Sequence, residues 1–357
     1  MMEHRYLFNF AVSYMGGGRK RLEEYSRWFN RRGGAWFIVH ANCASLRAEF
    51  PINCYFTVHQ SHFDRIFRDC AYIGGILQKI GKPLFYYSYG IPIYARVGQI
   101  DWFHCSNVLP LSWKGVPLSF ADRLKFRFLG DRILQNLCHA DVISAESQAS
   151  LSLFSNECLS KLILSVNGSD DELSFLSERD IGQKDNTATI LGTYSYKAVG
   201  DSYRIFQMLR RRDPALQLVI IGDKSGIPQA VRGDKGVNTT GLLNRKEVLA
   251  WLRKTKYYIS TTRVENSYNA AAEGVFLADE SYISDIPPHR ELLEGERFTR
   301  VSVPDVETPL LHVQRRELTG KNLKSWRDVV KNMISEIEKR LTQGGECAEQ
   351  SCRENTK

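Results

Sequence analysis

The chain has 357 residues, 43% of them hydrophobic and 25% charged, a balance that excludes global disorder and is sufficient for two domains. It has no run of eighteen apolar residues, no signal-peptide pattern at its start and no C-x-x-C pair among its eight cysteines, so we expect no membrane span, no zinc site, no disulfide framework and a cytoplasmic location. The net charge of +8 suits an anionic partner such as nucleotide phosphates or a membrane surface.

The first half of the chain alternates short apolar segments with amphipathic ones. The short segments are rich in aromatic and β-branched residues and predict strands at 6–12, 35–41, 55–60, 83–88, 101–107 and 142–147. Helices are expected at 16–34, where Leu22, Tyr25 and Phe29 share one face, and at 123–141. Alternation of strands and helices predicts a parallel sheet with helices on both faces.

A polar, acidic segment at 164–187 interrupts this series and contains Asn167-Gly168, as expected of a connection between domains. A second series of alternating elements follows it. Its expected strands and helices are 188–194, 201–214, 216–223, 245–255, 257–262 and 280–285.

The two series predict two doubly wound α/β domains that face a central cleft. We place the first domain at 1–168 and the second at 169–320. A helix at 321–341 is expected to pack back towards the first domain. The polar tail at 342–357 is expected to be disordered.

Short motifs occur in a particular order along both halves. The first turn contains G-G-G, and the connection between the domains contains N-G. The second half contains, in order, a G-x-x-x-x-K turn, "LVIIGD", a G-L turn, two glutamates separated by seven residues, and "SDIPPHREL". In this order and spacing they resemble the retaining nucleotide-sugar glycosyltransferases of the GT-B fold, in particular the E-x7-E group known as glycosyltransferase family 4. The resemblance covers nearly the whole chain and is strongest from Thr189 to Leu293. It implies two Rossmann-like domains and a UDP- or GDP-sugar donor.

Gly192 ends an expected strand, and Lys197 stands in the turn after it. A donor diphosphate gains negative charge as its glycosidic bond breaks, so a metal-free enzyme must stabilise it with cations and with N–H groups at helix starts. The resemblance implies that Lys197 binds the diphosphate and is catalytic; the alternative is a solvated loop lysine. Thr193 stands where the family often has an arginine, so one expected cation is missing or comes from elsewhere.

Gly16, Gly17 and Gly18 end the first strand and open the first helix. Without a Cβ atom the backbone can approach a ligand closely. The resemblance implies that this turn faces the donor phosphates and sugar; the alternative is a flexible turn. The dinucleotide pattern G-x-G-x-x-G fails because position 21 is Arg, which disfavours a nicotinamide-dependent dehydrogenase.

Glu265 follows the strand at 257–262, and Glu273 lies inside the next helix. The resemblance implies that Glu265 is catalytic and holds the sugar or its phosphate, and that Glu273 accepts hydrogen bonds from the ribose hydroxyls. Surface helix charges are the alternative. The resemblance also places these residues at the donor: Gly192, Gly241, Leu242, Asn266, Ser267, Tyr268 and Asn269. The last four replace a more usual glycine-containing turn, which leaves the sugar undetermined.

The family usually has a histidine of the N-terminal domain beside the donor sugar. His104 is the candidate for this catalytic position; a structural hydrogen bond at a strand end is the alternative. The resemblance implies no protein nucleophile, because the leaving phosphate is thought to assist deprotonation of the acceptor. No D-x-D motif stands where a metal-dependent transferase needs one, so we expect no metal and no other cofactor.

The segment 118–137 mixes apolar and aromatic residues with basic ones. An amphipathic basic helix can lie on anionic lipid, and it can equally pack on its sheet. Together with the resemblance, this favours a lipid-linked glycan acceptor in cell-surface polysaccharide or lipopolysaccharide O-antigen synthesis, peripheral contact with the inner face of the cell membrane, and no nucleic-acid partner. Two alternatives stay open: a catalytically silent nucleotide-sugar-binding subunit and a nucleotide-sugar epimerase.

Overall fold

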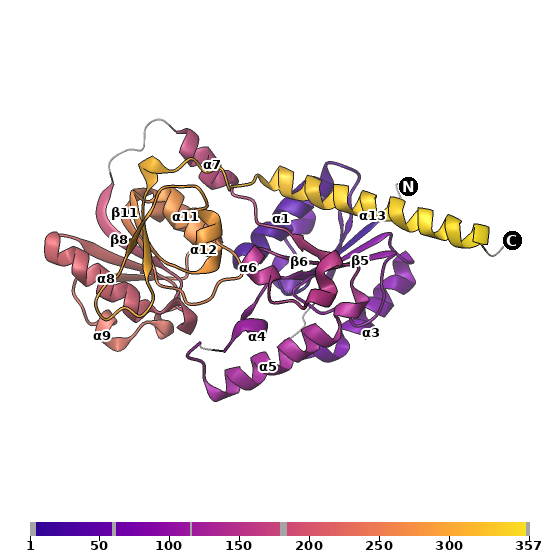
Figure 1. Cartoon of the computed structure of the whole chain (residues 1–357), viewed down its shortest axis with the longest axis horizontal. Coiled ribbons are helices and arrows are strands. Elements are labelled where there is room, and N and C mark those ends of the chain that lie inside the picture. The colour runs from indigo at the N-terminus through magenta and orange to yellow at the C-terminus, as the bar shows by residue number, and fades with distance from the viewer. Residues whose placement is uncertain (1–4, 59–61, 115, 179–183, 355–357) are drawn as a thin grey trace.

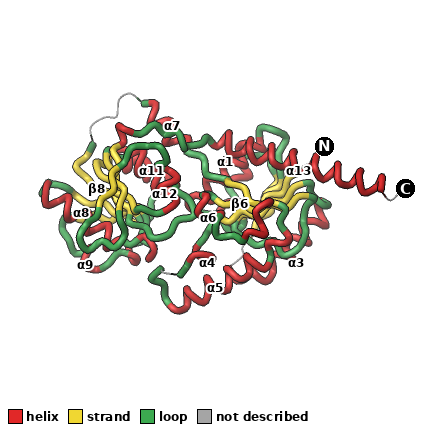
Figure 2. Tube along the Cα trace, viewed as in Figure 1, coloured by secondary structure: helices red, strands yellow, loops and turns green. Residues whose placement is uncertain are grey.

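The computed structural model describes residues 5–58, 62–114, 116–178 and 184–354. Two α/β domains lie side by side, each built on a seven-stranded sheet with helices around it (Figures 1 and 2). This confirms the predicted fold class of two doubly wound domains. The end of the strand expected at 55–60 lies outside the described residues.

The first sheet is parallel throughout and has the strand order β3-β2-β1-β4-β5-β6-β7. The chain starts in the middle, winds to one edge and then returns to the other, which is the doubly wound arrangement. The strands are β1 (Tyr6–Phe10), β2 (Trp36–His40), β3 (Cys54–Val58), β4 (Phe85–Tyr89), β5 (Ile100–Cys105), β6 (Val142–Ala145) and β7 (Leu162–Leu164). The helices are α1 (Gly16–Asn30), α2 (Leu46–Glu49), α3 (His62–Ile80), α4 (Leu109–Ser112), α5 (Phe120–Gln135) and α6 (Gln148–Leu151).

The second sheet has the order β10-β9-β8-β11-β12-β14-β13. The strands are β8 (Asp185–Leu191), β9 (Gln217–Ile221), β10 (Val237–Gly241), β11 (Thr255–Ser260), β12 (Glu280–Ser284), β13 (Thr299–Val301) and β14 (Leu310–Gln314). The helices are α7 (Asp170–Ser177), α8 (Val199–Arg212), α9 (Gln229–Arg232), α10 (Arg245–Lys254), α11 (Asn269–Leu277) and α12 (Pro287–Leu292). The sequence prediction ended with β12. β14 and β13 extend the sheet in the antiparallel direction, because β14 completes the hydrogen bonds of the edge strand β12.

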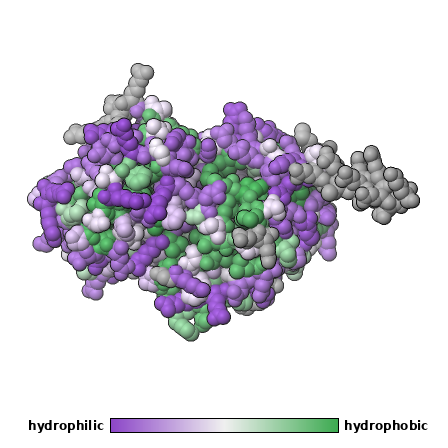
Figure 3. Space-filling view, viewed as in Figure 1, coloured by the Kyte–Doolittle hydropathy of each residue, from purple (hydrophilic) through white to green (hydrophobic). Residues whose placement is uncertain are grey.

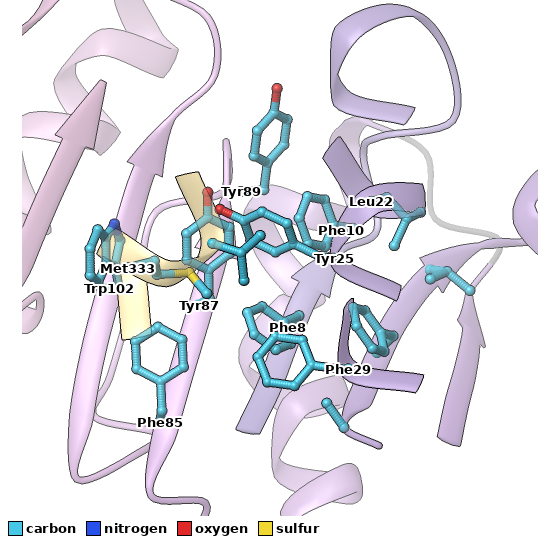
Figure 4. Packing of buried hydrophobic residues seen from close by; sticks show 14 of the residues in the cluster. Phe8, Phe10, Leu22, Tyr25, Phe29, Phe85, Tyr87, Tyr89, Trp102 and Met333 are labelled. Carbon is cyan, nitrogen blue, oxygen red and sulfur yellow. The ribbon is translucent and has the colours of Figure 1, made fainter. Parts of the chain in front are cut away.

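Both faces of the first sheet are buried. Alternate residues of a strand point to opposite faces, so Phe8 enters one core and Leu7 the other. The first core is largely aromatic, and Figure 4 shows Met333 beside Tyr87 and Trp102 within it. Met333 comes from the last helix of the chain, which therefore belongs to the packing of the first domain.

That last helix, α13 (Trp326–Glu354), lies along the first domain although it follows the second in sequence (Figure 1). Its Val330, Met333 and Ile337 are buried in the aromatic core. The structure continues the helix to Glu354, into the range 342–357 where the sequence predicts a disordered tail. Residues 355–357 lie outside the described part, and the order of the tail stays a prediction.

The chain crosses between the domains twice, and the two crossings are hydrogen-bonded to each other. Ser169 N donates to Lys324 O at 2.7 Å, and Trp326 N donates to Asp170 Oδ2 at 2.9 Å. A Cβ on Gly168 would lie 2.4 Å from the Trp326 ring, so this position requires glycine. The crossings form a compact joint, in which Ser169 and Asp170 belong to the predicted connection at 164–187 and Lys324 and Trp326 lie outside it. No described helix has the length and hydrophobicity to span a membrane.

Candidate functional site

Lys197 and Glu265 form an ion pair beyond the carboxyl ends of strands β8 and β11. Lys197 Nζ donates to Glu265 Oε1, and both side chains are mostly buried. Gly192 has φ +86°, and a Cβ there would stand 3.4 Å from Lys197 Cε, so the glycine leaves room for the lysine stem. The structure thus brings these three predicted residues together. Glu265 lies in a loop that contacts the first domain, where Val264 packs against its core.

His289 of α12 stands near this pair, within electrostatic reach of both charges. Its Nδ1 lies 2.7 Å from Ser284 O; because a carbonyl oxygen only accepts, Nδ1 carries the hydrogen and Nε2 is an acceptor. Burial lowers the pKa of His289 to about 4, although the Glu265 charge opposes this shift. The imidazole is therefore neutral at pH 7, and it adds no cation to the pair.

Two helices begin near each other at this end of the domains, α1 at Gly16 and α11 at Asn269. Neither has a side-chain cap, and within the described chain the first three N–H groups of each make no hydrogen bond. A Cβ on Gly17 would lie 3.0 Å from Asn269 Nδ2, and one on Gly18 would lie 2.9 Å from the Tyr89 ring. Helix N-termini carry free donors and partial positive charge, so this arrangement can bind an anion.

Glu273 has a different environment on the second turn of α11. It is paired with Arg245, whose Nη2 also lies 2.9 Å from Asp171 Oδ2 and 4.0 Å from Glu172 Oε1. Burial and the charge of Glu273 raise the pKa of Glu172, and Glu172 Oε2 has no hydrogen-bond partner among the described residues. Three carboxyl groups therefore surround Arg245, with Lys20 Nζ 4.0 Å from Asp171 Oδ2, which leaves acceptor capacity for hydroxyl groups.

The loop between the two glutamates also holds the domains together. Asn266 Nδ2 donates to Cys105 O at 3.0 Å, and Asn266 O accepts from Ser150 Oγ at 2.8 Å. Ser267 Oγ donates to Asn269 Oδ1 at 3.0 Å, which fixes the amide of Asn269 so that its Nδ2 faces the glycine turn. Asn266 and Ser267 are thus engaged with protein groups in this structure.

Three further residues are predicted at the donor: Gly241, Leu242 and Tyr268. Gly241 ends β10 with φ +79°, and its carbonyl accepts from Gly222 N at 3.0 Å. The next side chain, Leu242, is exposed. Tyr268 is buried in the core of the second domain, and burial raises its pKa to about 12. The donor-binding roles of these residues stay predictions.

His104 is fully buried at the end of β5. Its Nδ1 lies 2.8 Å from Ser144 Oγ and its Nε2 3.4 Å from Glu146 Oε1, while its ring stacks on Tyr89 at 5.0 Å. Burial and the charge of Arg21 lower the pKa of His104 to about 4. This geometry favours the structural hydrogen bond that the sequence left open, and a catalytic role stays a prediction.

Arg21 of α1 ties the interdomain connection to the candidate site. It is fully buried, donates to Asn167 Oδ1 at 3.1 Å and to Ser165 O at 2.8 Å, and lies 3.7 Å from Glu146 Oε1. Asn167 Nδ2 in turn donates to Ser267 Oγ at 3.4 Å. The helix that presents the glycine turn is therefore held in place through the joint between the domains.

Sequence reasoning did not single out four of these residues: Arg21, Glu172, Arg245 and His289. Arg245 had a local signal, because Asn244 and Glu247 form a capping box that marks it as the first residue of a helix. His289 stands within "SDIPPHREL", which was noted as a motif but not as a source of this side chain. Arg21 and Glu172 acquire their partners only through long-range contacts.

Comparisons with known proteins reveal similar structures but no similar sequences. The sequence matches no protein-family model and no curated protein. The structure of HepE from Anabaena in complex with UDP and glucose is similar over 82% of this chain and 83% of that one, with a TM-score of 0.53 and 15% identity. OtsA without ligand is similar over 81% and 86%, with a TM-score of 0.52 and 10% identity.

A structure of trehalose-6-phosphate synthase is also similar, over 81% of this chain and 86% of that one. It comes from a study of glycosyl transfer with retention that used bisubstrate glycomimetics. Its TM-score is 0.50 at 11% identity. Likeness at such low identity establishes the fold and not the activity. The chain therefore has the GT-B fold, with two Rossmann-like domains, as its sequence motifs predict.

Proposed function

We propose that this protein is a retaining glycosyltransferase that moves a sugar from a nucleoside-diphosphate donor to a glycan acceptor and requires no metal. The observation that carries the proposal is the meeting of three features at one place. The Lys197–Glu265 pair, the start of α11 and the glycine turn of α1 lie on elements that converge between the two domains. Together they supply a cation, free N–H donors and a carboxylate.

The charges suggest how a donor lies in this site. Its diphosphate takes Lys197 as a partner and the N–H groups at the starts of α1 and α11 as donors. Glu265, displaced from Lys197, becomes free to accept hydrogen bonds from sugar hydroxyls. The ribose hydroxyls donate to Glu273, where the surplus of carboxyl groups repels phosphate and favours hydroxyl donors.

The proposed reaction uses no protein nucleophile. The bond between the sugar C1 and the diphosphate oxygen breaks, and the acceptor oxygen bonds to C1 on the same face. The acceptor proton passes to an oxygen of the leaving phosphate. Lys197 and the helix N-termini stabilise the charge that develops on that phosphate. Glu265 orients the sugar during this step.

A first test is nucleotide binding without metal. Thermal unfolding is followed with UDP and with GDP, each with and without EDTA. We expect at least one nucleotide to stabilise the fold, by about 2.7 kcal/mol at roughly one hundred times its dissociation constant, and we expect EDTA to leave this unchanged. Stabilisation by neither nucleotide, or stabilisation that EDTA abolishes, would contradict the proposal.

A panel of UDP- and GDP-sugars then separates the proposal from its alternatives. Donor hydrolysis or transfer supports a glycosyltransferase, isomerisation an epimerase, and binding alone a silent subunit. One observation favours the silent subunit: Thr193, at the position where the family often has an arginine, donates to Asp223 O at 2.8 Å and supplies no cation. A lipid-linked glycan acceptor and a role in cell-surface polysaccharide synthesis complete the proposal, on the strength of the sequence resemblance.

A further inference from the structure

A cavity of about 400 Å³ lies between the two domains. Cavities of about 300–1,000 Å³ are typical of small-molecule sites, so this one is large enough for a ligand. Five of its lining residues come from the first domain and one from the second: Trp113, Lys114, Val116, Pro117, Arg123 and Arg263. Among these described residues three are cationic and none is acidic. The composition of the lining therefore favours an anionic ligand.

Arg263 connects the cavity with the candidate donor site. Its main-chain N–H donates to the carbonyl oxygen of Tyr196 at 2.8 Å, and Tyr196 directly precedes Lys197 in the chain. Arg263 also stands in the loop that carries Glu265. The cavity therefore lies next to both segments that supply the ion pair of the donor site.

The cavity and the carboxyl groups around Glu273 lie at opposite ends of the region between the domains. Trp113 directly follows α4, whereas Asp171, which shares Arg245 with Glu273, belongs to α7. Figure 1 shows α7 at the upper end of this region and α4 at its lower end. Under the proposed function the ribose lies beside Glu273, so the opposite end is where an acceptor can approach the transferred sugar.

The positive charge of the cavity is only partly neutralised by the protein. Arg263 Nη2 lies 2.9 Å from Glu307 Oε2 and 3.6 Å from Asp201 Oδ2. The Glu307 side chain is 73% exposed, and exposed ion pairs contribute little, so a ligand can compete with this one. Within the described part of the chain, Lys114 and Arg123 have no carboxylate within ion-pair distance.

A second cavity shows that basic side chains alone do not leave room for an anion. This cavity has a volume of about 580 Å³, lies in the second domain and is lined by Arg210 and Lys235 among others. Its lining also contains a carboxylate, Asp234, whose oxygens accept from Arg210 at 2.9 and 2.7 Å and from Tyr203 at 2.6 Å. The protein itself therefore satisfies the charge of Arg210. The described lining of the interdomain cavity holds no such internal anion.

Trp113 gives the interdomain cavity an apolar wall beside its cations. The Trp113 carbonyl accepts from Val116 N at 3.1 Å, which closes the turn between them, and Val116 is buried. Figure 3 shows hydrophilic residues beside apolar ones at this lower edge of the molecule. An aromatic face beside cations suits a ligand that has both a C–H surface and a negative charge, which is the character of an acidic sugar.

We propose that this cavity binds a sugar that carries a carboxylate or a phosphate. The acidic group lies among Lys114, Arg123 and Arg263, and the sugar ring lies on Trp113. Carboxylate and phosphate oxygens both match the planar donor fork of an arginine, so the two groups share this chemistry. That the bound sugar is the acceptor of the transfer rests on the proposed function; the binding itself does not.

The first test is calorimetric titration of the full chain with glucuronic acid, glucose 6-phosphate, glucose and inorganic phosphate. We expect each acidic sugar to bind at least about tenfold more tightly than glucose, because it adds charge-assisted hydrogen bonds. Each should also bind more tightly than inorganic phosphate, which has no ring to place on Trp113. The tighter acid identifies the recognised group. Equal binding of glucose, equal binding of inorganic phosphate, or no binding of either acid would overturn the proposal.

Paired variants test whether the acidic sugar lies in this cavity. Lys114→Ala with Arg123→Ala should weaken its binding by at least about tenfold, because two cationic partners are removed. The matched control, Lys125→Ala with Arg127→Ala, removes the same charge from exposed positions of α5 that do not line the cavity. Screening should limit the effect of the control to less than about twofold. Equal losses in both pairs, with circular dichroism confirming the fold, would show a response to net charge alone and overturn the proposal.

Initial rates with the active donor then test the acceptor role. The variant with Lys114→Ala and Arg123→Ala should raise the KM for an acidic acceptor by at least about tenfold and leave the donor KM unchanged. An unchanged acceptor KM would overturn this role. UDP and GDP thermal shifts test the donor site separately. Stabilisation by a nucleotide without binding of either acidic sugar would keep the glycosyltransferase and overturn the cavity proposal, and the reverse result would keep the cavity proposal alone.

Discussion

The carboxylates of Glu265 and Glu273 belong to one loop and helix but have contrasting surroundings. Glu265 has one cation, Lys197, and a neutral neighbour, His289. Glu273 shares its cation, Arg245, with two further carboxyl groups. The first region is electrically balanced and lies next to free helix N-termini. In the second, the carboxylates of Glu273 and Asp171 face one close cation, Arg245, with Lys20 4.0 Å from Asp171. A pKa of about 8 keeps Glu172 neutral there at pH 7.

This difference teaches which part of a nucleotide-sugar each region can accept. A phosphate that enters the first region can replace the Glu265 carboxylate as the partner of Lys197. An anion entering the second would face more than one carboxylate at close range, which is unfavourable. Hydroxyl groups meet no such barrier and find acceptors there. Under the proposed function, we therefore expect the diphosphate beside Glu265 and the ribose beside Glu273.

The largest expected effect comes from Lys197→Ala. Under the proposed function, the variant removes a charge-assisted hydrogen bond to the diphosphate, worth roughly 1.5–3 kcal/mol. We therefore expect donor affinity or transfer to fall about 10- to 150-fold, measured by titration with UDP and GDP and by initial rates with the active donor. Circular dichroism serves as the folding control. A folded variant with wild-type kinetics would return Lys197 to the role of a solvated loop lysine.

The two glutamates should then fail in different ways when each is replaced by Gln. Glu265→Gln should chiefly lower kcat, by about tenfold, because it acts on the sugar where bonds change. Glu273→Gln should chiefly raise the donor KM, by about three- to tenfold, because it holds a part of the donor that does not react. Steady-state kinetics against donor concentration separate these parameters.

Either of two outcomes would break this comparison. Equal, small effects of both variants would mean that the spacing of the glutamates is a coincidence of composition. A kcat loss from Glu273→Gln with only a KM change from Glu265→Gln would keep the glycosyltransferase and reverse the two roles. Asp171→Asn is a useful companion variant, because it reduces negative charge beside Glu273 without touching either glutamate.

The smallest expected effects are on stability as a function of pH. They test the electrostatic contrast between the regions of Glu265 and Glu273. His289 has a pKa of about 4 in the fold against 6.5 when free, so the unfolded chain binds the extra proton and stability is lost as pH falls from 6.5 towards 4. This loss is about 2 kcal/mol at pH 5. His289→Gln should remove it, as measured by urea unfolding at pH 7.5 and 5.0. His104 retains its own similar dependence as an internal reference.

The region of Glu273 should respond in the opposite direction. Burial and the charge of Glu273 raise the pKa of Glu172 from 4.5 to about 8, so its contribution to stability is present below 4.5 and is lost as pH rises through 8. Glu172→Gln should therefore be more stable than the wild type at pH 9 relative to pH 5. If both substitutions flattened the same limb of the pH profile, the two regions would not be electrostatically distinct.

Local periodicity predicted most of the elements from the sequence. The strand at 6–12 and the helix at 16–34 are examples. Each was predicted from the spacing of its apolar residues, which depends only on residues close in sequence. The spacing of the two glutamates was also visible locally, because a single loop and the helix that follows it carry both residues. Strands β14 and β13 were missed, since their pairing depends on an edge strand far away in sequence.

By itself, the sequence determined the two α/β series, the glycine turn and the separation of Glu265 from Glu273. Only the tertiary structure decided the partners of those glutamates: Lys197 is 68 residues from Glu265, and Arg245 is 28 residues from Glu273. It also decided that α13 returns to the first domain. The physical reason is that a residue's own helix or strand sets the direction of its side chain, whereas the loops that meet at the ends of parallel strands set which charges come together.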